Sequence, residues 1–83
     1  MTVPMIHLNG TSREALLDQV CAAEAAGRAF LDALANMTPN GRDYYVKGDD
    51  ALRQALHEHD ARVVKIKSVM TELQELAEAI ALR

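Results

Sequence analysis

The sequence predicts an all-α fold: a two-helix antiparallel hairpin with a short extended N-terminal arm, assembling into a helical-bundle homo-oligomer. Hydrophobic residues make up 49% of the 83 residues but aromatic residues only 4%, and alanine supplies much of the apolar share, which suits closely packed helices. Two long segments repeat apolar residues at alternating spacings of four and three, which is typical of helices facing a partner helix. A stretch containing Pro39, Gly41 and Gly48 separates them. A chain of this length forms one domain, residues 1–83.

Residues 1–10 are expected to form the extended arm. The run Met5–Leu8 is short, largely apolar and tolerant of extended backbone. Asn9-Gly10 then supplies turn chemistry before a helix begins.

The first helix is predicted over residues 12–37. Thr11 and Glu14 match a Ser/Thr-x-x-Glu capping box, in which the Thr11 hydroxyl accepts from the Glu14 amide. Pro39 stops the pattern, because proline cannot continue a helix. The apolar residues expected to face a partner helix are Leu16, Val20, Ala23, Gly27, Phe30, Leu34 and Met37.

A loop is expected over residues 38–49 and the second helix over residues 50–82. Asp49 or Asp50 is the expected N-terminal cap of that helix. Its apolar positions keep the same spacing, at Leu52, Leu56, His59, Val63, Ile66, Met70, Leu73, Ala77 and Ile80.

Helix lengths and apolar surface predict that copies of the chain associate. The first helix would be about 39 Å long and the second about 50 Å, so the far end of the second, with Leu73, Leu76 and Ile80, needs the arm or another subunit to cover it. A second apolar stripe (Leu17, Leu31, Val69 and Leu76) would be buried in a bundle of two hairpins. Gly27 costs about 1 kcal/mol relative to alanine in mid-helix, which indicates a close helix crossing there.

Composition and charge narrow the classes of function. A net charge of −3 and a pI near 5.5 argue against binding of duplex nucleic acid. No apolar run approaches the roughly 20 residues of a membrane span, and the N-terminus lacks signal-peptide features, so no membrane partner and a cytoplasmic location are expected. Cys21 stands alone on an alanine-rich segment and is predicted to be a small buried hydrophobe.

No pattern of catalytic or metal-ligating residues is found in the sequence. His57 and His59 are two apart on a helix and point in different directions, whereas a metal site requires three or four ligands. His59 falls on the apolar side, which favours a core histidine hydrogen-bonded across the bundle. A Walker loop, a catalytic triad and a carboxylate dyad are all missing. We therefore expect no enzymatic activity, no metal and no cofactor.

The interruption between the helices concentrates residues suited to recognition. Asn40-Gly41 favours a turn, Arg42 is a bidentate donor, Asp43 is an acceptor, and Tyr44 and Tyr45 offer stacking surfaces. The alternative is structural: one tyrosine plugs the open end of the helix pair while Arg42 and Asp43 pair locally.

Charge is segregated along the second helix. Arg62, Lys65 and Lys67 form a basic stretch, and Arg42, Lys47 and Arg53 precede it, whereas Glu72, Glu75 and Glu78 make the distal end acidic. Most such runs are solvated faces. The functional alternative is an anion-facing surface near the loop.

Two strings, Ile6-His-Leu-Asn-Gly-Thr-Ser12 and Pro39-Asn-Gly-Arg-Asp-Tyr-Tyr45, resemble those in a family of small, mostly uncharacterised tailed-bacteriophage proteins with an arm and two helices. The likeness spans nearly the whole chain, but its specific part is confined to these strings, and Val46-Lys47 replaces the Pro-Gln pair that the resemblance implies. The resemblance implies a phage accessory protein in the host bacterial cytoplasm. Analogy with other small helical phage proteins adds a counter-defence role.

These observations lead to one functional hypothesis with two alternatives. The hypothesis is a homo-oligomer that sequesters a nucleotide-like immune signal through Asn9, Thr11, Asn40, Arg42, Asp43, Tyr44, Tyr45 and Lys47. Because the arm and the loop lie at opposite ends of the first helix, neighbouring subunits have to bring them together; otherwise the arm is structural, with Ile6 and Leu8 packing against Leu76 and Ile80. The alternatives are an inhibitor of a host or bacterial defence protein, resembling an anti-CRISPR, and a structural phage component.

Overall fold

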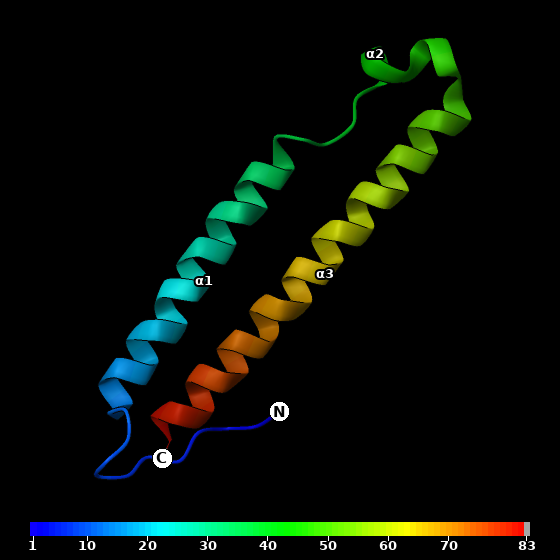
Figure 1. Ribbon diagram of the computed structural model, residues 1–83. Helices are drawn as coiled ribbons and strands as arrows, with labels where there is room; N and C mark the ends of the chain where they lie inside the picture. Colours follow the sequence, from blue (N-terminus) through cyan, green and yellow to red (C-terminus); the bar gives the residue numbers. More distant parts are fainter. Residues whose placement is uncertain (83) are drawn as a thin grey trace.

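A computed structural model describes residues 1–82 and shows two long antiparallel helices joined at one end (Figure 1). Helix α1 spans Arg13–Ala35 and helix α3 spans Asp49–Ala81. Between them lie a short helix, α2 (Gly41–Tyr44), and a 3-10 turn, η1 (Tyr45–Lys47). No strand occurs within residues 1–82, so the all-α prediction is confirmed. Each long helix ends within two residues of its expected bounds, whereas the expected loop at 38–49 contains α2 and η1.

The cap of α1 lies one residue later than the sequence predicts. Ser12 has extended backbone, and its hydroxyl accepts from the Ala15 amide at 3.1 Å. The predicted Thr11–Glu14 capping box is therefore wrong, because the residue three positions after Ser12 is an alanine that cannot return a bond. Glu14 instead lies in the first turn, where its charge interacts favourably with the helix dipole.

The start of α3 also differs from the prediction. Gly48 is the N-terminal cap, and it makes no side-chain hydrogen bond. Its φ of 92° lies in the left-handed region that favours glycine, so glycine is required to turn the chain into α3. Asp49 and Asp50 follow in the first turn of α3, where they complement the helix dipole instead of capping it.

Two contacts fix how α1 and α3 are aligned. A Cβ on Gly27 would overlap Met70 Sδ, and Thr38 Oγ1 lies 3.3 Å from His59 Nε2. In an antiparallel pair the numbers of facing residues add to a constant, and both contacts give 97. The predicted close crossing at Gly27 is thus confirmed.

The predicted apolar stripe of α3 is confirmed. Each of its members is buried or half-buried, and Ile80, at 1% exposed, is the most deeply buried. His59 is buried as well. The Thr38 hydroxyl donates to the Ala35 carbonyl at 2.8 Å, so it accepts from His59 Nε2, and the prediction of a core histidine bonded across the helix pair is confirmed.

The predicted stripe of α1 is wrong at three of its seven positions. Leu16, Val20, Gly27 and Leu34 are buried or half-buried, but between them Glu24 and Leu31 face α3 in place of Ala23 and Phe30. Phe30 is 50% exposed, and Ala23 and Met37 are exposed as well. The close approach at Gly27 accommodates Leu31 more readily than the bulkier Phe30 ring. Cys21 is exposed, which corrects its prediction as a buried hydrophobe.

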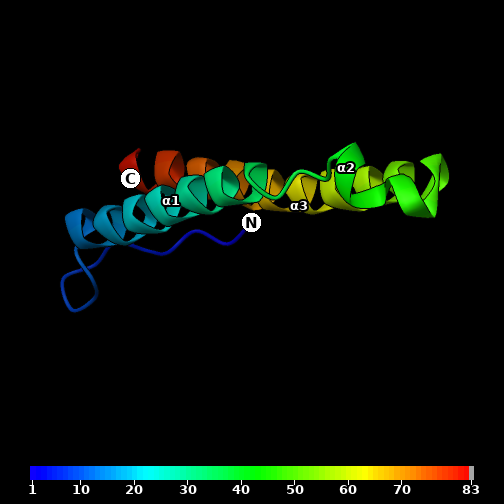
Figure 2. The same cartoon turned by 90° about the horizontal axis from the view of Figure 1, so that it is seen from above.

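The overhang of the longer helix lies at the opposite end from the one expected. The alignment of α1 and α3 places Arg13 just beyond the last turn of α3, so Leu73, Leu76 and Ile80 are flanked by α1. The unmatched part of α3 is instead its N-terminal part, residues 49–61, where α2 and η1 fold back on it and Gly41 approaches Leu52 (Figures 1 and 2). The arm passes the C-terminal end of α3 and continues along one side of the helix pair (Figures 1 and 2).

The molecule is long and exposes a large surface. Its extents are 62 × 20 × 16 Å and its radius of gyration is 18.6 Å, against about 12 Å for a compact chain of this length. It exposes 6298 Å², whereas a compact monomer of 9.1 kDa exposes about 4,900 Å². No helix among the described residues has both the length and the apolar character needed to cross a membrane.

Candidate functional site

The tip, defined as residues 40–48, is a small framework held by Asn40. The Asn40 side-chain oxygen accepts from the Arg42 amide at 3.0 Å, and its amide nitrogen donates to Asp43 Oδ2 at 3.0 Å. Asn40 thereby caps α2. Two predicted ligand contacts, Asn40 and Asp43, are bonded to each other, so their first role is to shape the turn.

The remaining tip residues present their side chains to solvent. Arg42 and Lys47 are exposed, and Tyr45 and Val46 are 78% and 76% exposed. Tyr44 is half-buried, which fits the predicted plug for one tyrosine and leaves Tyr45 as the free aromatic ring. A guanidinium, an ammonium and an aromatic face within six residues suit an anionic ligand with a planar group.

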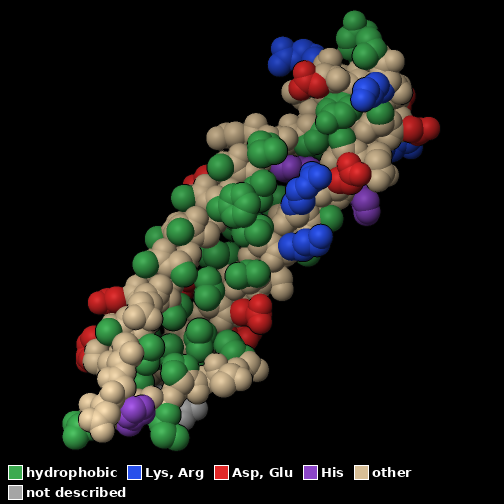
Figure 3. All heavy atoms as spheres, in the orientation of Figure 1, with side chains coloured by type: hydrophobic (Ala, Val, Ile, Leu, Met, Phe, Trp, Pro, Cys, Tyr) green, Lys and Arg blue, Asp and Glu red, His purple; other side chains and the backbone are tan. Residues whose placement is uncertain are grey.

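The tip cations Arg42 and Lys47 have no acidic partner among residues 1–82. The ion pairs among the described residues are Arg28–Glu24 at 3.8 Å and Arg53–Asp50 at 2.8 Å. Neither Arg42 nor Lys47 lies within 4.0 Å of a described carboxylate, so local pairing of Arg42 with Asp43 is not observed. Figure 3 shows Lys and Arg side chains at this end of the molecule and along the adjoining part of α3.

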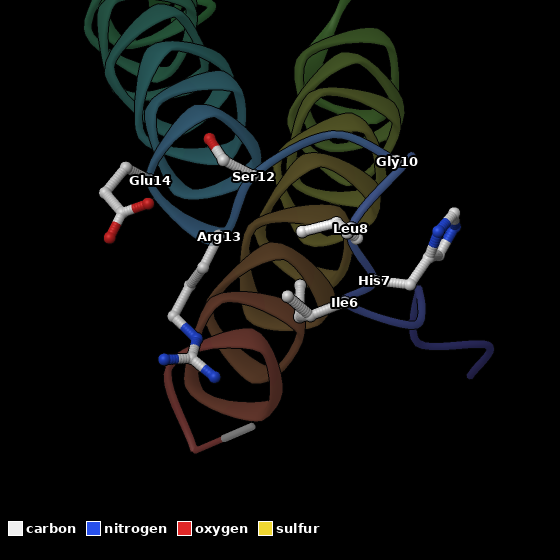
Figure 4. A pocket seen from close by; sticks show the side chains of 7 residues that line it. All are labelled: Ile6, His7, Leu8, Gly10, Ser12, Arg13 and Glu14. Carbon is white, nitrogen blue, oxygen red and sulfur yellow. The ribbon is translucent and has the colours of Figure 1, made fainter.

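The second candidate region is the corner, defined as residues 6–14, where the arm turns into α1. The Gly10 amide donates to the His7 carbonyl at 3.1 Å, which closes the turn predicted at Asn9-Gly10. An open hollow of about 470 Å³ lies here, lined by Ile6, His7, Leu8, Gly10, Ser12, Arg13 and Glu14 (Figure 4). The predicted contacts Asn9 and Thr11 are exposed and stand beside the hollow without lining it.

Arg13 is the residue at the corner that the sequence reasoning missed. It is half-buried, and its Nε is buried without a hydrogen-bond partner. A cation in the first turn of a helix opposes the helix dipole, and this mismatch was visible in the sequence. Figure 4 shows Arg13 directed towards the C-terminal end of α3, where the negative pole of that helix offsets the unfavourable position.

The structural interpretation of the arm holds only in part. Leu8 is 99% exposed, so its predicted packing against Leu76 and Ile80 is wrong. Val3, Pro4 and Ile6 are half-buried. The turn at Gly10 explains the difference, because it carries the chain away from the helix ends between Ile6 and α1.

The tip and the corner lie at opposite ends of α1 (Figure 1). With 23 residues, α1 separates them by about 35 Å. The eight predicted site residues therefore form two groups, with Asn9 and Thr11 at the corner and the other six at the tip. One chain does not bring the two groups together.

The histidines of α3 are divided between core and solvent. His57 is exposed and His59 is buried. Within residues 1–82, no group of three or more His, Cys, Asp or Glu side chains is placed to hold a metal ion.

No family model, curated protein sequence or solved structure matches the chain. The resemblance to tailed-phage proteins therefore remains a prediction that depends on the two strings at the corner and the tip. Any functional assignment depends on the chemistry of these two regions.

Proposed function

We propose that the protein is a non-enzymatic phage accessory protein that acts in counter-defence, as an oligomer that sequesters an anionic, nucleotide-like ligand. The observation that supports binding is the tip, where Arg42 and Lys47, which form no ion pair within residues 1–82, flank the exposed ring of Tyr45 on a turn fixed by Asn40. The phage origin, the location in the host bacterial cytoplasm and the counter-defence role follow from the resemblance of the two strings.

Each tip side chain has a separate task in this proposal. The Arg42 guanidinium donates two parallel hydrogen bonds to a phosphate, and Lys47 adds a compact positive charge. Tyr45 stacks on the base, an interaction worth roughly 1–3 kcal/mol per base. Asn40 and Asp43 hold the turn, and Tyr44 anchors it to the helix pair.

The corner of a neighbouring chain completes the site. Asn9 and Thr11 are exposed polar side chains beside the hollow, and Arg13 adds a cation. An exposed tip alone leaves most of a nucleotide in water, whereas ligand sites usually bury most of their ligand. The proposal therefore requires an oligomer.

A second candidate function is inhibition of a host or bacterial defence protein through the tip. The exposure of Val46 beside Tyr45 favours this second function, because an exposed aliphatic side chain suits an apolar protein surface better than a charged nucleotide. Aromatic and arginine side chains dominate the binding energy of many protein interfaces.

Thermal unfolding with added nucleotides tests the first function. A ligand that binds only the folded protein stabilises it by about 2.7 kcal/mol at 100 times its dissociation constant. We expect a cyclic dinucleotide or a related nucleotide to raise the unfolding temperature of the wild type by several degrees. Arg42→Ala and Tyr45→Ala should abolish the shift, whereas Arg28→Ala, an exposed arginine on α1, should retain it.

The same variants separate the two functions. If millimolar nucleotides of every class leave the unfolding temperature unchanged, sequestration is excluded. Binding to a defence protein would then appear as capture by the wild type and by Arg28→Ala but not by Arg42→Ala or Tyr45→Ala.

A further inference from the structure

One side of the helix pair carries apolar side chains that remain open to solvent. Phe30 of α1 and Val69 of α3 are each 50% exposed. Phe30 precedes Leu31, which faces α3, and Val69 precedes Met70, which faces α1. In an antiparallel pair, equal offsets from the facing positions lie on the same side, so Phe30 and Val69 share one side. The view in Figure 3 shows hydrophobic side chains following the boundary between the two helices.

The α3 part of this side is a row of residues at alternating spacings of four and three, so the row follows one face of the helix. Four of its six residues are charged, and Val69 and Leu76 are apolar. We call this row the Val69 stripe, and it comprises Glu58, Arg62, Lys65, Val69, Glu72 and Leu76.

The charges nearest Val69 in the stripe differ in sign on its two sides. Two cations, Arg62 and Lys65, directly precede Val69 and the anion Glu72 follows it, whereas Glu58 lies further away at the start of the stripe. Arg62, Lys65 and Glu72 take no part in an ion pair among the described residues. A parallel copy would oppose Lys65 to Lys65, whereas an antiparallel copy would oppose Lys65 to Glu72.

The exposed area of the molecule is sufficient for such a contact. The chain exposes about 1,400 Å² more than a compact monomer of its mass. A stable protein interface buries about 800 Å² on each partner.

We propose that a second copy of this chain docks on the Val69 stripe, with the two α3 helices antiparallel about a two-fold axis near Val69. Val69 then packs against Val69 of the second copy, and Phe30 flanks the contact. Lys65 lies opposite Glu72 of the second copy, and the symmetry repeats that pair.

This dimer brings the tip of one chain to the corner of the other. With Lys65 opposite Glu72, the numbers of facing residues on the two α3 helices add to about 137. The tip packs at Gly41 against Leu52. Along the helix axis, Leu52 then lies at the same height as the point just beyond the C-terminal end of α3 in the second copy. The alignment of α1 and α3 places Arg13 of that copy at the same level. The shared ligand site rests on the proposed function, but the dimer itself does not.

Cysteine cross-linking tests the dimer without any ligand. The background is Cys21→Ser, because Cys21 is exposed and is the single cysteine of the chain. Val69→Cys in this background should form a covalent dimer on mild oxidation, since residues at a two-fold axis approach within disulfide distance. Val64→Cys, also exposed but on the other flank of α3, is the control and should stay uncross-linked.

Charge reversal tests the orientation of the two copies. Lys65→Glu or Glu72→Lys alone should raise the dimer dissociation constant about 10- to 100-fold, because each variant replaces two attractive pairs with two repulsive ones. The double variant should recover the wild-type value, as measured by sedimentation equilibrium. A monomeric wild type, cross-linking of Val64→Cys at least as efficient as that of Val69→Cys, or no recovery in the double variant would each overturn the proposal. A dimer that passes these tests but binds no nucleotide would exclude only the proposed ligand.

Discussion

The seam between α1 and α3 differs from the tip in what holds its side chains. In the seam, Val20, Leu34, Met70 and Ile80 are buried against the facing helix. At the tip, hydrogen bonds within the turn set the backbone, and most of the side chains point into water. Burial of apolar area supplies most of the folding free energy, so stability depends on the seam. The proposed function assigns recognition to a turn that contributes little to stability.

This separation has a physical basis in the lengths of the helices. Since α3 has 33 residues and α1 only 23, the N-terminal part of α3 extends past its partner. The chain covers that part with α2 and η1, which are too short to bury much side-chain area. The side chains of the covering segment therefore remain available to a ligand or a partner.

Truncation of Ile80 should have the largest effect on the seam. Ile80 is 1% exposed, so Ile80→Ala removes fully buried methyl groups and should lower the free energy of unfolding by about 2–5 kcal/mol. Leu82→Ala is the matched control, because Leu82 is 88% exposed two residues further on. It should change stability by less than about 0.5 kcal/mol. Chemical denaturation at one fixed protein concentration measures both, and equal losses would show that the seam does not extend to this end.

Gly27 tests how closely the helices approach in the middle of the seam. An exposed glycine-to-alanine change in a helix gains about 1 kcal/mol. Gly27→Ala should instead fail to stabilise the protein and should cost about 1 kcal/mol, because the new methyl group meets buried Met70.

Ala26→Gly supplies the comparison for Gly27, since Ala26 is exposed on the same turn. It should cost about 1 kcal/mol through helix propensity alone. Thermal unfolding of the two variants side by side gives the answer. A Gly27→Ala protein more stable than wild type would mean that Met70 yields easily and that the crossing is loose.

The seam of α3 was predictable from the sequence because one stripe dominates that helix. On α1, Val20, Gly27 and Leu34 belong equally to two stripes, one completed by Ala23 and Phe30 and the other by Glu24 and Leu31. Periodicity does not choose between them. The choice depends on which side chain fits beside Met70. The polarity of the residues does not predict it either, because the charged Glu24 has a side chain that is only 13% exposed.

The tip was predictable in composition but not in geometry. Its turn residues and cations were visible in the sequence, and so was the expectation that one of the two tyrosines is structural. Which tyrosine is free depends on the phase of α2, a four-residue helix set by a single Asn40 cap. The end at which α3 overhangs depends on the path of the same segment, so helix lengths alone could not locate it.

The two tyrosines give the smallest and sharpest test of the difference between seam and tip. Tyr45 is 78% exposed, so Tyr45→Ala should alter the free energy of unfolding by less than about 0.5 kcal/mol. Tyr44 is half-buried, so Tyr44→Ala should cost about 1–2 kcal/mol through lost burial. Urea denaturation followed by circular dichroism resolves this difference. Equal costs for the two variants would place both rings in the structural framework and would leave Arg42 and Lys47 as the free recognition groups of the tip.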